Sequence, residues 1–93
     1  MKNNKINIIR RKLDKLDLSM LALIKKRSLL VNKILYEKKY KNQIVDRKRI
    51  NVILKKIKTE SKKKNIDSKI TNTIWKSMIK AFINYEFRNF KKK

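Results

Sequence analysis

The chain has 93 residues, with 29 Lys or Arg against 7 Asp or Glu, so its formal net charge is +22. This length suffices for one small domain with a modest core. The absence of cysteine and histidine excludes disulfides, thiol nucleophiles, the usual zinc ligand sets and triads with an imidazole base. Without glycine or proline, helices meet no built-in breaker and turns with positive φ are disfavoured, so we expect an all-α fold.

A long first helix is predicted over about residues 5–40. Its apolar residues recur at spacings of three and four, which is typical of an amphipathic helix, and no breaker precedes the segment KYKNQIV. At 1.5 Å per residue this helix would be about 50 Å long, whereas a compact chain of this length has a radius of gyration of roughly 12 to 13 Å. We therefore expect an intertwined homodimer, although a bend near Ser28 or Asn32 would allow a monomeric bundle.

Two further helices complete the expected single domain over residues 1–93. A short one over about 46–60 follows an extended QIV segment, starts at the N-cap Asp46 and frays in TESKKKN. A medium one over about 67–90 is capped by Asp67 or Ser68, and residues 91–93 form a basic tail. The predicted architecture is thus three helices per chain.

Two cations interrupt the apolar face of the first predicted helix. Arg27 and Lys38 are eleven residues apart, three helical turns, so their charged groups share one face and could flank a small ligand. Alternatively each lies at the edge of the apolar stripe and extends its charge into water. Arg49 shares a face with Asp46 and Ile50, and it could equally be a solvated residue of a first turn.

Glu86 stands on an aromatic face of the third predicted helix, four residues after Phe82. Burial there would favour a neutral carboxylic acid that can donate a hydrogen bond, while nearby Arg and Lys would favour the carboxylate. The alternative is a local pair with Arg88 or Lys80 at the surface.

These residues match a known pattern as a group. The segments IIRRKLDKLDLSMLALIKKRSLLVNKILYEKK, IVDRKRINVIL and IWKSMIKAFINYEF resemble the all-helical chorismate mutases, the intertwined three-helix dimers of aromatic amino-acid biosynthesis. The resemblance extends from about Ile8 to Phe90. The ordered set that carries it is Arg10, Leu16 with Asp17, Arg27, Lys38, and Asp46 with Arg49.

The resemblance implies a catalytic site in each half of the dimer. Arg10 would be donated by the partner chain to clasp one substrate carboxylate, and Arg27 would bind the other. Lys38 would reach a carboxylate and the ether oxygen, and Glu86 falls where the family hydrogen-bonds that ether oxygen through Gln or Glu. The implied reaction is the Claisen rearrangement of chorismate to prephenate. This reaction is unimolecular and needs no cofactor or metal.

The substrate hydroxyl would lie near the junction of loop and second helix, where Asp46 and Arg49 fall. Ile50 occupies a position where the family commonly has a glutamate, and Phe82 one where a small hydroxylated residue often sits. The related isochorismate-pyruvate lyases share the fold and tolerate an aliphatic residue after the loop arginine. A lyase is therefore the alternative enzyme, although Asp46 resembles the mutase pattern.

The large positive charge raises a different class of function, a basic helical nucleic-acid-binding protein. Its lysines are spread along the chain rather than gathered in one stripe, and they accompany many Ile and Asn residues with A/T-rich codons. We therefore favour genome bias as the cause of the charge, and a nucleic-acid-binding protein stays the less favoured alternative of another class. The start MKNNKINIIRRK lacks a signal-peptide core and no segment approaches the roughly 20 apolar residues of a membrane span, so we expect a cytoplasmic protein without a membrane partner.

Overall fold

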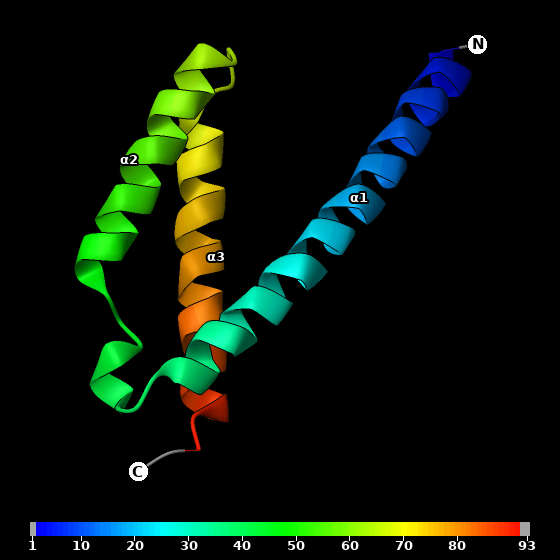
Figure 1. Cartoon of the computed structure of the whole chain (residues 1–93). Coiled ribbons are helices and arrows are strands. Elements are labelled where there is room, and N and C mark those ends of the chain that lie inside the picture. Colours follow the sequence, from blue (N-terminus) through cyan, green and yellow to red (C-terminus); the bar gives the residue numbers. More distant parts are fainter. Residues whose placement is uncertain (1, 92–93) are drawn as a thin grey trace. The chain divides into compact units, whose positions relative to one another are not determined.

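The computed structural model describes residues 2–91, and over these residues it contains helices and no strand. The helices are α1 (Lys2–Glu37), the 3₁₀ turn η1 (Lys41–Gln43), α2 (Arg47–Lys63) and α3 (Ser68–Asn89) (Figure 1). The predicted all-α fold of three helices is confirmed. Of the predicted basic tail only Lys91 lies within the described residues. The chain divides between Val31 and Asn32 into two compact units.

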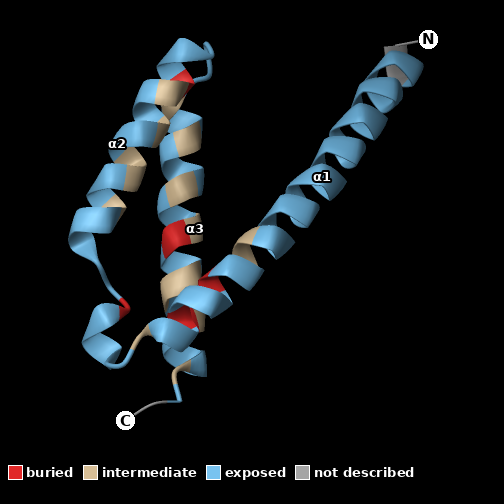
Figure 2. Cartoon of the chain, viewed as in Figure 1, coloured by how far each residue is buried: buried red, intermediate tan, exposed pale blue. Residues whose placement is uncertain are grey.

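The first unit consists of α1 alone, up to Val31. Every residue over 4–26 is exposed, as the uniform pale blue of this stretch shows in Figure 2. Large apolar side chains are included, with Leu16 at 60% and Leu23 at 63% of their full exposure. A single helix cannot bury its own apolar stripe, so this unit alone leaves that stripe in contact with solvent.

In the second unit, α1 ends at Glu37, and a side chain organises the connection that follows. The Gln43 Oε1 accepts hydrogen bonds from the backbone N–H groups of Lys39 at 2.6 Å and Tyr40 at 2.9 Å. Ile44 closes η1 by donating its N–H to the carbonyl of Lys41, and its side chain is 4% exposed. The prediction of an extended QIV segment was wrong here, because these local bonds and the burial of Ile44 form a turn.

The helix α2 begins as predicted and ends later than predicted. Asp46 caps it by accepting the N–H of Arg49 at 3.0 Å. The helix continues to Lys63, and its end is closed by Asn65 at φ 56°. The N–H of Ile66 bonds the carbonyl of Ser61 at 2.9 Å and the N–H of Asn65 bonds that of Lys62 at 3.2 Å, which is a Schellman motif. Asparagine thus provides the left-handed residue in a chain without glycine.

The helices α2 and α3 lie side by side and antiparallel (Figure 1). Ser61 is 3% exposed, donates to the carbonyl of Ile57 and shares a hydroxyl hydrogen bond of 2.8 Å with Thr71 on α3. Tyr85 of α3 donates to the Asn32 side chain at 2.8 Å, which attaches the last turns of α1 to the same helix. Buried Leu35, Ile44 and Ile79 supply the apolar core of this unit.

Asp67 determines where α3 begins, since its Oδ1 accepts the N–H of Lys69 at 2.9 Å. We expect Asp67→Ala to lower the free energy of unfolding by about 1 kcal/mol, because an N–H of the first turn loses its acceptor. Asp67→Asn keeps an acceptor and should stay close to the native value. Urea unfolding followed by circular dichroism at one fixed protein concentration measures both. Equal losses in the two variants would contradict a capping role.

Candidate active site

The second unit brings together two of the charged residues selected from the sequence. The Nζ of Lys38, just after α1, lies 2.7 Å from the Oε2 of Glu86 on α3, and the side chains are 16% and 10% exposed. Glu86 is a buried residue, so its alternative placement as a surface partner of Arg88 or Lys80 was wrong. Because water is largely excluded from this pair, its charges interact more strongly than a surface pair would.

Several contacts hold Lys38 at this position. The hydrogen bond between Tyr85 and Asn32 fixes the last turns of α1 beside α3. Tyr85 directly precedes Glu86 in the sequence. After Lys38, the Gln43 side chain binds the next two backbone N–H groups. The carbonyl of Ile44 lies 3.5 Å from the Lys38 Nζ as a second, longer acceptor. Contacts made by residues before and after Lys38 in the sequence therefore position its ammonium group.

Each member of the pair keeps hydrogen-bonding capacity. An ammonium has three N–H donors, and among the described residues the Lys38 Nζ meets two acceptors, Glu86 and Ile44. The Oε2 of Glu86 makes the bond to Lys38. Because an ammonium has three N–H groups and a carboxyl group two oxygens, a ligand atom placed next to the pair could contact Lys38 or Glu86 in addition to their bond to each other.

An open hollow of about 740 Å³ adjoins Lys38 at the connection between η1 and α2. It is lined by Lys38, Asn42, Gln43, Val45, Asp46, Arg47 and Lys48. Three of these side chains are cationic and one is acidic, and the acidic one accepts the first-turn N–H of α2. The hollow therefore has a positive potential that favours an anionic ligand.

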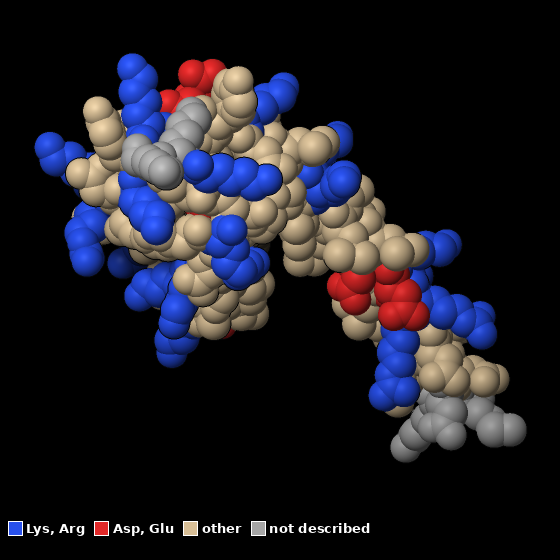
Figure 3. Space-filling view, turned by 90° about the horizontal axis from the view of Figure 1, so that it is seen from below, with Lys and Arg blue, Asp and Glu red and all other residues tan. Residues whose placement is uncertain are grey.

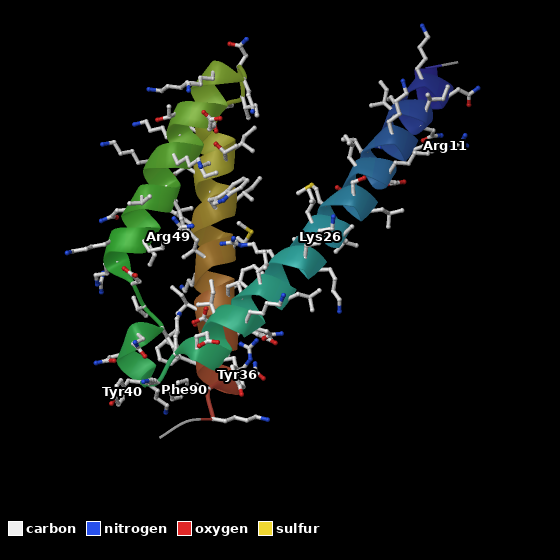
Figure 4. All side chains as sticks on the ribbon, viewed as in Figure 1. Arg11, Lys26, Tyr36, Tyr40, Arg49 and Phe90 are labelled. Atoms are coloured by element: carbon white, nitrogen blue, oxygen red, sulfur yellow. The ribbon has the colours of Figure 1, made fainter. Side chains whose placement is uncertain are left out.

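Four other residues were expected to bind substrate. Asp46 lines the hollow, whereas Arg49 and Ile50 do not. Arg49 is exposed in the first turn of α2, as labelled in Figure 4, and Ile50 is half-buried. Phe82 is half-buried on α3, one turn before Glu86.

Arg10 and Arg27 belong to α1 within the first unit. Arg10 is exposed and Arg27 is half-buried. Because both lie in the first unit, their role in a common site with Lys38 stays a prediction.

Sequence reasoning missed two residues that shape the site. Gln43 was part of a segment treated only as a breaker, and nothing in its spacing indicated that its side chain would bind the backbone after Lys38. Ile44 carried a weak signal, because it is an apolar residue in a polar connection, and it proves to be buried.

The arrangement suits binding chemistry rather than covalent catalysis. It presents cations to an anionic ligand in the hollow, and the Glu86 carboxyl group lies 2.7 Å from the ammonium of Lys38, the lining residue that it contacts. A ligand whose oxygen gains negative charge during reaction would be stabilised by such fixed donors.

Comparison with known proteins identifies the family. Residues 9–87 match the family model described as Chorismate mutase type II. A search of curated proteins and a search of solved structures both gave no match. The family match covers most of the chain and includes Lys38, Glu86 and the whole of α2. The chain therefore belongs to the type II chorismate mutases, an all-helical family of isomerases.

Proposed function

We propose that the protein rearranges chorismate to prephenate in the biosynthesis of phenylalanine and tyrosine. The observation that carries this proposal is the partly buried pair of Lys38 and Glu86, 2.7 Å apart, beside a positive hollow. Chorismate is a dianion with an ether oxygen, and this pair can bind that oxygen while the hollow attracts the carboxylates.

The mechanism requires the flexible substrate to be held in its compact conformer while the ether bond breaks. Arg10 and Arg27 would bind the two carboxylates through planar bidentate contacts. Lys38 and Glu86 would contact the ether oxygen, and their hydrogen bonds would strengthen as that oxygen gains charge. This selective stabilisation of the transition state is the source of the rate enhancement.

To donate a hydrogen bond to the ether oxygen, Glu86 has to act through the O–H of a carboxylic acid. Lys38, 2.7 Å away, has further N–H groups with which it could contact a substrate carboxylate as well as Glu86.

A homodimer would complete the site. Arg10 precedes Lys38 by 28 residues, and at 1.5 Å per residue a helix places them roughly 40 Å apart. A substrate bound at Lys38 would then be reached by Arg10 of a second copy. The exposed apolar stripe of the first unit supports the same assembly, because pairing of two such helices would bury it.

The alternative reaction on this fold is the release of pyruvate from isochorismate. Ile50 favours it, since an aliphatic residue stands where mutases commonly place a hydroxyl-binding glutamate. Asp46, which lines the hollow, favours the mutase.

The test is incubation of the purified protein with chorismate and, separately, with isochorismate. We expect loss of chorismate with formation of prephenate, and no release of pyruvate from isochorismate. Pyruvate from isochorismate without turnover of chorismate would assign the lyase reaction, and no turnover of either substrate would contradict both. The Lys38→Ala protein, prepared in the same way, controls for contaminating enzymes.

We also propose that the chain acts as one chorismate mutase-like domain in the cytoplasm. The family match extends across both units, from residue 9 to residue 87. Within the described residues, no helix has the length and apolar character needed to cross a membrane.

A further inference from the structure

Four lysines gather around one groove between α2 and α3, away from the hollow at Lys38. The groove has a volume of about 500 Å³. Its lining residues are Leu54, Lys55, Lys58, Ser68, Lys69, Asn72 and Lys76. All four lysines are exposed, so their ammonium groups are accessible from solvent.

Helical spacing explains why these lysines border the same groove. Lys55 and Lys58 are three residues apart on α2, and Lys69 and Lys76 are seven residues apart on α3, so each pair lies on one face of its helix. The antiparallel packing of α2 on α3 then brings the two faces together.

The acidic residues in and beside α2 and α3 make contacts outside the groove. Asp67 caps α3, Glu60 lies 3.4 Å from Lys63, and Glu86 pairs with Lys38. No acidic residue lines the groove. On a different face, seen from below in Figure 3, cationic side chains also outnumber acidic ones. The four lysines therefore give the groove a positive charge that an anionic ligand can neutralise.

We propose that this groove binds a single strand of nucleic acid through its phosphates. Lys69 and Lys76 are separated by about 10 Å along α3, and together with Lys55 and Lys58 on α2 they offer four cations to the phosphates of one strand. The hydroxyl of Ser68 and the amide of Asn72 add hydrogen-bond donors. No aromatic side chain lines the groove, so binding is independent of base sequence.

In the sequence alone the lysines form no stripe along the chain, which makes nucleic-acid binding the less favoured alternative. Packing α2 against α3 creates a short double row from residues up to 21 positions apart, Lys55 to Lys76. The inference does not depend on the proposed mutase activity, because no groove residue lines the hollow at Lys38.

The test compares two variants that lose the same charge. One replaces the groove lysines Lys55, Lys58, Lys69 and Lys76 with Gln. The other replaces four exposed lysines outside the groove, Lys39, Lys41, Lys64 and Lys91, with Gln. Lysine and glutamine have similar helix propensities, and circular dichroism verifies folding. Binding of a fluorescent 12-nucleotide oligo(dT) is followed by anisotropy over a series of salt concentrations.

We expect the groove variant to lose about tenfold or more in affinity, and its slope of log affinity against log salt to fall by about 3, since each of the four lost lysine–phosphate contacts contributes about 0.7. The control variant should change the slope by less than about 1. Equal losses in both variants would assign binding to the overall charge and overturn the proposal. So would no binding by the native protein, or binding only to vesicles of anionic lipid. Turnover of chorismate should be unchanged in the groove variant.

Discussion

Lys38→Ala should lower kcat for chorismate by a factor of about 10² to 10³, the cost of removing one donor from a developing oxyanion. In the structure the Lys38 ammonium is fixed by Glu86 at 2.7 Å and oriented by the carbonyl of Ile44 at 3.5 Å. Little reorganisation is then needed when the ether oxygen gains charge, and alanine loses this stabilisation entirely. Initial rates of chorismate consumption measure the effect.

The matched control is Lys39→Ala, which removes the neighbouring exposed lysine and should leave kcat within about twofold, as expected for a surface change. Loss of Lys38 also leaves Glu86 without its cation, so folding has to be verified by circular dichroism. Lys38→Met keeps the length of the side chain and fills the same space. Native-like turnover in a folded Lys38→Met protein would contradict the proposed role.

The helices were predictable because their signals are local. The apolar period of three to four residues indicated α1, and the carboxylates of Asp46 and Asp67 accept first-turn N–H groups as predicted. The C-terminal end of α2 was not predictable in the same way. The segment TESKKKN is polar and was expected to fray, but Ser61 is buried against Thr71 and Asn65 takes a positive φ. A contact between two helices decided this boundary.

In the candidate site, too, local signals were predictable and contacts between helices were not. Polar residues in apolar rows marked Lys38 and Glu86 separately, because periodicity identifies a face without naming what packs on it. Their pairing joins residues 48 positions apart and depends on how α1 and α3 meet, which local spacing does not encode. Gln43 gave no signal at all, because its function is to bind backbone groups in a connection of irregular shape.

Glu86→Gln should retain chorismate turnover within about tenfold of the native rate, whereas Glu86→Leu should lose about 10² or more. A glutamine amide can accept from Lys38 through its oxygen and donate to the ether oxygen through its nitrogen, so it reproduces the protonated acid that the mechanism requires. Leucine offers neither group and leaves the Lys38 ammonium unpaired in a site where it is 16% exposed.

Initial rates of chorismate consumption by the native protein and both variants make the comparison, with circular dichroism as the control for folding. An inactive but folded Glu86→Gln protein would show that Glu86 acts as a carboxylate that orients Lys38, and would remove it from contact with the ether oxygen.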